Sequence, residues 1–287
     1  MIANAWFWAG AAALLWATLD AVRKRLARDV PSVTAVVWLS LGPAVAFVGW
    51  AVAAEVTVPT ETTYWAPALG SVLLNAVAYV SFMEALARSP LSLTIPLLSL
   101  SPVFTAGAAF VTVGEVPSLA QLGGVSIVVA GAFELQRPSG AGWSAVGREP
   151  GAKYMLLTAL LWSLSAALDK RALAHAAVPF HAAVQTAGIG CILVAGLAVR
   201  GRTHELAAIR RGGRPFVLAL LLTMLAIATQ LIAYERLLVS LVEALKRGTG
   251  VVVALLLGRY LFRERISPRQ IVVALAIAGG AVLVLTA

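Results

Sequence analysis

Ten runs of predominantly apolar residues follow one another along this chain, each close to the length of one membrane span. An α-helix needs about 20 such residues to cross the hydrocarbon core of a bilayer. Inside a bilayer only helices and closed barrels satisfy their own backbone hydrogen bonds. Charged residues make up only 12% of the chain, about half of their usual share in soluble proteins. We therefore predict an all-α membrane protein, with helices at residues 6–27, 32–53, 64–87, 91–113, 118–136, 153–174, 178–199, 215–238, 240–262 and 268–286.

Two sets of five helices are predicted, because the chain contains similar segments in the same order. "LLWATLDAVRKR" (Leu14 to Arg25) aligns with "LLWSLSAALDKR" (Leu160 to Arg171), and later "GEVPSLAQ" aligns with "RERISPRQ". The stretch between the sets is rich in Gly, Pro and Ser, which is typical of a linker. We therefore expect a first repeat at 1–136, a linker at 137–152 and a second repeat at 153–287.

The number of helices in each repeat predicts their orientation. A unit of five spans ends on the opposite side of the membrane from its start, so its second copy must be inverted, as in many secondary transporters. The 22 Lys and Arg residues support this, because 17 lie in or beside odd-numbered loops and 5 lie elsewhere. The positive-inside rule then places the odd-numbered loops in the cytoplasm and both termini outside. This rule also explains the net charge of +9 without nucleic acid as a partner.

The chain resembles the ten-span EamA-type members of the drug/metabolite transporter superfamily. The resemblance is carried by the two "LLW" segments, by "SLSPVFTAGAAFVTVGE" at 99–115 and by "GVVVALLLGRYLFRERI" at 250–266. It implies solute transport by alternating access, without ATP hydrolysis. We expect the protein in a bacterial-type inner (plasma) membrane. Many relatives are expected to keep both termini in the cytoplasm, which is opposite to the orientation that the charges predict here.

Two adjacent cations, Lys246 and Arg247, lie inside the ninth apolar run. Each costs about 2.5–3.5 kcal/mol at the centre of a spanning helix, whereas pairing with Glu243 on an isolated helix returns only about 0.2–0.5 kcal/mol. One interpretation is this local pairing, and another is that the pair reaches back to the lipid headgroups. The third, which we favour, is that both cations face a central cavity and bind an anionic group of a substrate. Some sugar-phosphate and nucleotide-sugar branches of the superfamily also carry a Lys-Arg pair late in the chain.

Glycines and prolines near these cations predict interrupted helices. Gly248 and Gly250 follow the pair directly, and Pro96 and Pro102 lie at the matching place in the first half. Helices that Gly or Pro interrupts at corresponding positions of two repeats often mark the binding site of a transporter. We therefore expect the substrate between the fourth and ninth helices.

The remaining candidates are polar or aromatic groups within apolar runs. Each has a structural alternative: pairing with a nearby arginine for the carboxylates, and helix packing or helix–helix hydrogen bonds for the others. Asp20 and Asp169 are assigned to local pairing only. Candidates for coupling are Glu84, Glu235 and Glu243, and candidates for the substrate path are Asn75, Tyr79, Gln185, Gln230, Trp16 and Trp162.

The function predicted from these features is secondary active transport of a small organic anion or zwitterion. No catalytic motif, phosphate-binding loop or metal-ligand spacing occurs in the sequence, so we expect neither an enzyme nor a cofactor. Two alternatives stay open: a flippase for a lipid-linked phosphate or sugar, and a scaffold that transports nothing. The expected partners are the substrate and the lipid bilayer, and a homodimer also stays open.

Overall fold

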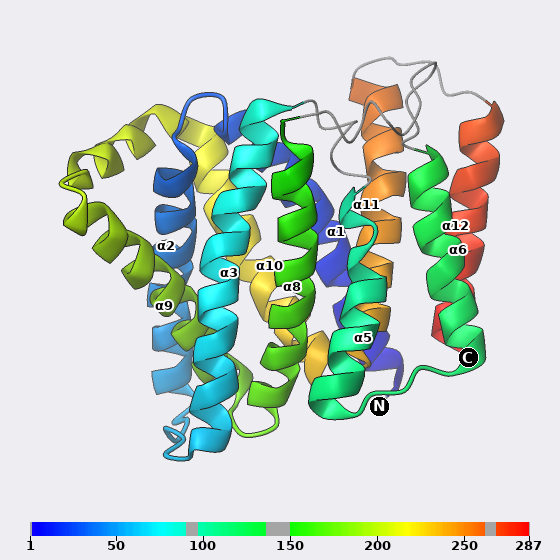
Figure 1. Ribbon diagram of the computed structural model, residues 1–287, viewed down its shortest axis with the longest axis horizontal. Coiled ribbons are helices and arrows are strands. Elements are labelled where there is room, and N and C mark those ends of the chain that lie inside the picture. The colour runs from blue at the N-terminus through cyan, green and yellow to red at the C-terminus, as the bar shows by residue number, and fades with distance from the viewer. Residues whose placement is uncertain (1, 90–96, 136–149, 262–267, 287) are drawn as a thin grey trace.

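The computed structural model describes residues 2–89, 97–135, 150–261 and 268–286, which form ten α-helices and one 3-10 helix. Figure 1 shows most of the helices side by side, with their axes roughly aligned and the chain passing up some of them and down others. The helices are α1 (Ile2–Leu26), α2 (Ser32–Ala53), α3 (Thr62–Arg88), α5 (Ser101–Val113), α6 (Leu119–Leu135), α8 (Ala152–Leu173), α9 (Val178–Val199), α10 (Gly213–Arg236), α11 (Val239–Leu261) and α12 (Pro268–Thr286), and the 3-10 helix is η1 (Thr203–Gly212).

The ends of these helices lie within a few residues of the predicted spans, with one exception. The apolar run 91–113 was predicted as one helix, but α5 begins at Ser101 after a turn at residues 99 and 100. Pro102 lies in the first turn of α5, where a residue without an N–H is tolerated. The basic segment that was predicted as a link between spans 7 and 8 contains η1.

Length and composition allow several helices to cross a bilayer. Among the described residues, five helical segments are both long and apolar enough: Asn4–Leu26, Ser32–Ala53, Thr62–Arg88, Val178–Val199 and Thr203–Arg236. Large apolar side chains such as Val45, Phe110 and Leu275 are more than half exposed on the outside of the bundle. An outer surface of this kind suits lipid as its solvent, because soluble proteins rarely expose large apolar patches.

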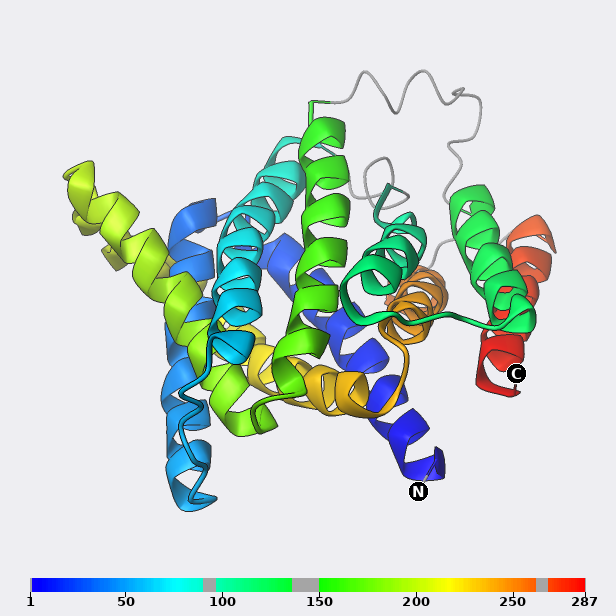
Figure 2. The ribbon, with the colours of Figure 1, turned by 60° about the horizontal axis from the view of Figure 1, so that its bottom comes forward.

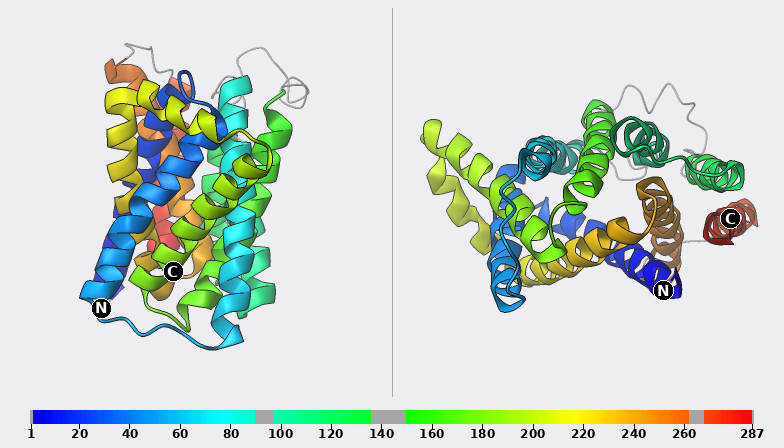
Figure 3. Two further views of the ribbon diagram at one scale, coloured as in Figure 1. Left: turned by 90° about the vertical axis from the view of Figure 1, so that its left-hand side faces the viewer. Right: turned by 90° about the horizontal axis from the view of Figure 1, so that it is seen from below.

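The two halves of the chain interlock instead of forming separate bundles. α3 packs on α8 and α1 packs on α10, while α5 packs on α8 and α1 packs on α11. α2 pairs with α9 on one side of the molecule, and α6 pairs with α12 on the other, as the end-on view shows (Figure 3). The first-half helices correspond in chain order to α8, α9, α10, α11 and α12. Replacing each helix by its counterpart turns the α3–α8 contact into α10–α1 and the α5–α8 contact into α11–α1, while the α2–α9 and α6–α12 contacts map onto themselves. In Figure 1, α1 starts at the lower end of the view, whereas α8 starts at the upper end.

Two lysines at equivalent places cap the carbonyl ends of two helices. Lys24 Nζ donates to Leu86 O (2.8 Å) and Ser89 O (3.4 Å) at the end of α3. Lys170 Nζ donates to the carbonyls of Tyr234 and Leu237 at the end of α10. A cation at the C-terminus of a helix interacts favourably with its unpaired carbonyl groups. Lys24 and Lys170 are the two lysines that the alignment of the "LLW" segments places together.

The Gly-Glu pair that follows α5 also has a structural role. Gly114 has a φ of 71°, a left-handed conformation that ends the helix and that glycine adopts without a Cβ penalty. Glu115 Oε2 then accepts a hydrogen bond from Val239 N (2.9 Å), the first residue of α11. α10 slants across the bundle and ends beside the start of α11, as Figure 2 shows. Glu115 therefore fixes the point at which α11 begins.

The predicted interruption of the ninth helix is wrong. α11 continues without a break from Val239 to Leu261, through both Gly248 and Gly250. A Cβ at Gly248 would lie 3.1 Å from Ile277 and 3.2 Å from Val128. Gly248 thus permits close packing of α11 against α6 and α12, a common use of glycine between membrane helices.

Candidate substrate site

Glu243, Lys246 and Arg247 form a buried charged group in the first half of α11. Lys246 Nζ lies 2.6 Å from Glu243 Oε1, and Arg247 Nη2 lies 3.6 Å from Glu243 Oε2. The side chains of Glu243 and Lys246 are only 4% and 8% exposed. Lys246 thus has a close carboxylate partner, whereas Arg247 has a looser one. The local pairing that the sequence allowed is therefore present, and it satisfies Lys246 better than Arg247.

Two side chains of α10 form hydrogen bonds with the two members of the Lys246–Glu243 pair. Lys246 Nζ donates to Gln230 Oε1 (2.5 Å) on α10. Tyr234 OH, also on α10, donates to Glu243 Oε1 (2.6 Å). Hydrogen bonds to both members of a buried ion pair offset part of the cost of removing the charges from water.

Aromatic rings from the two halves lie beside the cations. Lys246 Nζ is 5.2 Å from the centre of the Trp16 ring on α1. Arg247 Cζ is 5.8 Å from the ring of Trp162 on α8, which in turn packs edge-on against Tyr79 of α3 at 5.4 Å. Cation–π contacts of this kind are attractive within about 6 Å. Trp16, Tyr79, Trp162 and Gln230, four of the candidates for the substrate path, therefore lie beside the cation pair.

The structure adds Arg23 to this site, a residue that the sequence analysis counted only among loop charges. Arg23 is 3% exposed, and its guanidinium lies 5.1 Å from the Trp16 ring and 5.3 Å from the Tyr79 ring. Its carboxylate neighbour is Asp20, at 3.8 Å. The signal in the sequence was spacing: Trp16, Asp20 and Arg23 recur at intervals of four and three residues, which places them on one face of a helix.

Unpaired hydrogen-bond donors gather in this cluster. Within the described part of the chain, four of its buried nitrogens have no hydrogen-bond partner: Trp16 Nε1, Arg23 Nη1, Trp162 Nε1 and Arg247 Nε. More than 90% of buried polar groups in proteins find a partner, so each exception asks for an explanation. All four atoms carry hydrogens and can act only as donors, so a bound molecule with acceptor atoms would satisfy them.

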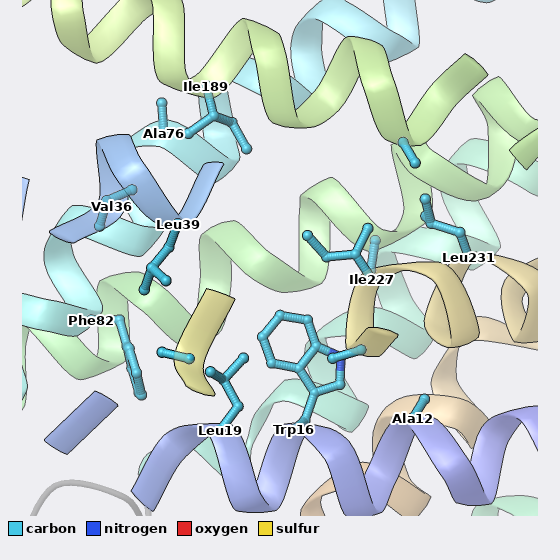
Figure 4. Close-up of a cluster of buried hydrophobic side chains, with 14 of the residues drawn as sticks. Ala12, Trp16, Leu19, Val36, Leu39, Ala76, Phe82, Ile189, Ile227 and Leu231 are labelled. Atoms are coloured by element: carbon cyan, nitrogen blue, oxygen red, sulfur yellow. The ribbon is translucent and has the colours of Figure 1, made fainter. Parts of the chain in front are cut away.

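A small cavity adjoins Arg23 and Tyr79. Its wall includes apolar side chains from α2, α3, α9 and α10, and five of them, Val36, Leu39, Phe82, Ile189 and Ile227, are labelled in Figure 4. Ser40, Thr186 and Thr223 also line it. The free space is about 10 Å³, close to the minimum for a single water molecule. A metabolite therefore needs a rearrangement of the helices before it can occupy this cavity.

Two predicted path residues, Asn75 and Gln185, belong to a second polar group. Gln185 Nε2 donates to Asp169 Oδ2 (2.8 Å), and Asn75 Nδ2 donates to Ser71 Oγ (3.1 Å). Ser71 itself donates to Asp169 Oδ1. The sequence predicts local pairing of Asp169 with a neighbouring cation, and Ser71 is not among its candidate site residues. The missed signal was again spacing, since Ser71, Asn75 and Tyr79 recur every four residues along α3.

The remaining predicted site residues lie elsewhere. Glu84 pairs with Arg88 at 2.8 Å on the end of α3, and Glu235 is exposed on the end of α10. Of the three carboxylates proposed for coupling, Glu243 alone lies within the cation cluster. Gly250 has open space beside it, and Pro96 lies outside the described residues. Nowhere in the described ranges do three His, Cys, Asp or Glu residues gather as a metal site would require.

Comparisons with known proteins place the chain in a family. The model of the EamA-like transporter family matches residues 4–135 and 149–286. A solved structure described only as a crystal structure of a protein superposes with a TM-score of 0.74 at 18% sequence identity, covering 98% of this chain and 96% of its own. That likeness supports the fold alone, and no curated protein sequence matches this chain. Because the family model spans most of both halves, the chain belongs to the EamA-like transporter family of multi-pass membrane proteins.

Proposed function

We propose that this protein is a secondary active transporter for a small organic anion or zwitterion, with the substrate's negative group bound by Arg247, Arg23 and Lys246. The observation that carries the proposal is the set of four buried donors without acceptors around these cations. A carboxylate or phosphate supplies several acceptor oxygens, and an arginine binds either group through two parallel hydrogen bonds. A neutral solute would leave the charge of the site unbalanced.

The charges of the cluster support the same substrate class. Its three cations, Arg23, Lys246 and Arg247, face two carboxylates, Asp20 and Glu243. The cluster therefore carries one positive charge more than its own acidic groups neutralise. Because an unbalanced charge is costly within a bilayer, an anionic group of the substrate would stabilise the site.

The small size of the cavity and the arrangement of the two halves support alternating access. With space for about one water molecule, the cavity must enlarge toward one side of the membrane and then toward the other. We propose that the ten helices cross the bilayer as two inverted five-helix repeats, 1–136 and 153–287, joined by residues 137–152. The exchange of helix contacts between halves, the equivalent caps by Lys24 and Lys170 and the opposite directions of α1 and α8 support this arrangement.

Ligand screening on the purified protein tests the proposed substrate class. Anionic and neutral metabolites at millimolar concentration would be compared by thermal shift, because a ligand stabilises the protein only when its concentration exceeds its dissociation constant. Anions should raise the melting temperature, and neutral compounds should not. Stabilisation by neutral compounds alone would refute the proposed substrate class.

Substitution of Arg247 tests the site itself. Arg247→Ala should weaken binding of a stabilising anion by about 2–5 kcal/mol, the usual loss when one partner of a buried charge pair is removed. Arg247→Lys should restore binding only in part, since the two-pronged geometry of the guanidinium is lost. Arg171→Ala is the matched control, because Arg171 is exposed at the end of α8. Equal binding by Arg247→Ala and the control would contradict this site.

The orientation in the membrane is part of the proposal. Five arginines between residues 200 and 214 favour a cytoplasmic position for this segment. In a Cys191→Ser background, a cysteine placed at residue 207 should resist an impermeant thiol reagent in intact cells. A cysteine at residue 57, between α2 and α3, should react. The reverse labelling pattern would show that the orientation is opposite to the one proposed.

A further inference from the structure

Asp169 of α8 and His181 of α9 form a buried pair outside the substrate site. We propose that this pair is a reversible proton-binding site of the transporter, with the proton carried on His181 Nδ1. The existence of the site rests on the geometry below, and its role in driving transport rests on the proposed function. Glu84, Glu235 and Glu243, the carboxylates considered for coupling from the sequence, do not contribute to it.

Each atom of the pair has a defined partner. His181 Nε2 lies 3.1 Å from Asp169 Oδ1, and His181 Nδ1 lies 3.4 Å from Tyr64 OH. Asp169 also accepts hydrogen bonds from Ser71 and from Gln185 (2.8 Å). Tyr64 and His181 are fully buried, and Asp169 is 2% exposed.

The charge balance is what makes this pair a candidate for proton binding. Ser71, Gln185 and Tyr64 are neutral donors, so His181 is the partner of Asp169 that can become a cation. With neutral imidazole the group carries one negative charge, and with one more proton it carries none. A charge inside a membrane protein is costly unless it is paired, and histidine is the side chain whose charge changes between pH 5 and 8. The pair can therefore exist in two states that differ by one proton and by one unit of buried charge.

No other described cation takes the place of that proton. α2 and α9 contain no Lys, Arg, Asp or Glu. Lys170 turns away to the carbonyls at the end of α10 and to Glu115, and Arg171 is exposed. Tyr64 and Tyr79 from α3 and Tyr234 from α10 also interact electrostatically with Asp169, and tyrosine is uncharged near neutral pH.

Proton uptake requires only that the Tyr64 hydroxyl change from a hydrogen-bond donor to an acceptor toward His181 Nδ1. Because Asp169 is an acceptor, Nε2 carries a hydrogen and donates to it, and Nδ1 of the neutral ring accepts from Tyr64 O–H. A proton delivered from water bonds to Nδ1, and Nδ1–H then donates to Tyr64 Oη. Release reverses these steps. Tyr64 is in the first turn of α3, next to the exposed residues Thr62 and Thr63, so the proton enters from this end of the bundle.

A continuous set of contacts joins the proton site to the substrate site. Ser71 links Asp169 to Asn75, and Ser165 Oγ lies 3.3 Å from Asn75 Oδ1 and 3.1 Å from the carbonyl of Trp162. The ring of Trp162 contacts Arg247. Asp169 and Trp162 also lie on the same helix, two turns apart. A change in the hydrogen bonds around Asp169 can thus be transmitted to the substrate cations through packed groups.

Nitrogen NMR of the histidine rings tests the proton site without any substrate. The full chain has three histidines, so the His175→Gln/His204→Gln protein, labelled with [15N]histidine in lipid bilayers, reports on His181 alone. We expect its Nδ1 to gain a proton between pH 9 and pH 5. In Asp169→Asn the pH at which Nδ1 gains this proton should be lower by at least one unit, because the balancing carboxylate is absent. Tyr64→Phe, which keeps the ring, is the second variant should Asp169→Asn fail to fold.

The same measurement defines the result that would overturn the proposal. A His181 ring that stays neutral from pH 9 to pH 5 in the folded protein would make the group a structural network with no proton function. Protonation at the same pH in wild type, Asp169→Asn and Tyr64→Phe would overturn it equally, because the pair would not then act as one site.

Uptake of inorganic [32P]phosphate into proteoliposomes tests the role in transport. Wild-type uptake should change at least threefold when a pH difference is imposed across the membrane. His181→Gln should retain uptake and lose this dependence, while the exposed His175→Gln should behave as wild type. An unchanged pH response in His181→Gln would refute coupling through this site. If wild type takes up no phosphate, the proposed substrate class fails for this anion, and the NMR titration alone decides the proton site.

Discussion

Replacing Glu243 by glutamine is expected to destabilise the folded protein strongly although it changes few atoms. The carboxylate accepts hydrogen bonds from Tyr234 OH and Lys246 Nζ, both at 2.6 Å, and its second oxygen faces Arg247 at 3.6 Å. Glutamine has nearly the same shape and one oxygen that still accepts from Tyr234. The substitution therefore removes the charge with little change in packing, leaving two buried cations without their carboxylate.

The size of the effect follows from burial of the pair. Removing one partner of a buried ion pair typically costs 3–5 kcal/mol, because the other charge is left uncompensated; we expect about 3 kcal/mol or more for Glu243→Gln. Lys246→Met should cost less, about 1–3 kcal/mol, since Glu243 keeps Arg247 as a partner. Glu243→Gln/Lys246→Met removes the Glu243–Lys246 pair and leaves Arg247 as the one cation of the pair without its carboxylate, so it should be no less stable than Glu243→Gln alone.

A double-mutant cycle measures this prediction. The free energy of unfolding would be determined for the four proteins by reversible titration with sodium dodecyl sulfate in mixed micelles, followed by circular dichroism. The expected coupling between the two positions is about 1–3 kcal/mol, because the loss from Lys246→Met should disappear once Glu243 is neutral; residues in direct contact reach such values. Additive losses, or a Glu243→Gln protein as stable as wild type, would refute the view that Glu243 neutralises this cluster.

Three further outcomes follow from contacts elsewhere. Gly280→Ala should destabilise the protein by about 1–3 kcal/mol, because its Cβ would lie 3.0 Å from a backbone oxygen of α6; Gly10→Ala, with open space at its Cβ, is the matched control in chemical unfolding. Lys170→Met should cost about 1.5–3 kcal/mol in the same assay through lost charged hydrogen bonds. On η1, hydrogen bonding to Arg202 lowers the pKa of Glu205 from its usual 4.5. This depressed pKa means that the contact stabilises η1 above pH 4.5 and is lost as the pH falls through the folded pKa. The carboxyl ¹³C shift of Glu205 should therefore titrate below 4.5 in wild type and closer to it in Arg202→Gln.

The sequence predicted most helix ends well because the apolar runs are long and are bounded by charged, Gly or Pro residues. α2, α9 and α12 begin and end at the predicted residues, and most other ends differ by one or two. The cation pair could also be found, because charge inside an apolar run is costly wherever the run packs. Neither argument needs knowledge of which helices touch.

Arg23 and His181 could not be found in this way, because their importance depends on contacts between helices. Arg23 lies near the end of an apolar run, where a positive charge is usually solvated, yet the Trp16 and Tyr79 rings cover it. His181 and Asp169 are on different helices, and their approach depends on how α8 packs against α9. Gly248 shows the same limit, because a glycine that loosens a helix and one that permits close packing look alike in sequence.

Glu243 shows how burial changes the strength of an interaction. On an isolated helix its spacing from Lys246 contributes about 0.2–0.5 kcal/mol, too little to offset two buried cations. In the folded protein, Tyr234 and Gln230 complete the hydrogen bonds of the pair, so the attraction acts where water cannot screen it. Arg247 receives less of this compensation, at 3.6 Å from Glu243 and with Nε unpartnered. The cation that the protein satisfies least is thus the one best placed to bind an incoming anion.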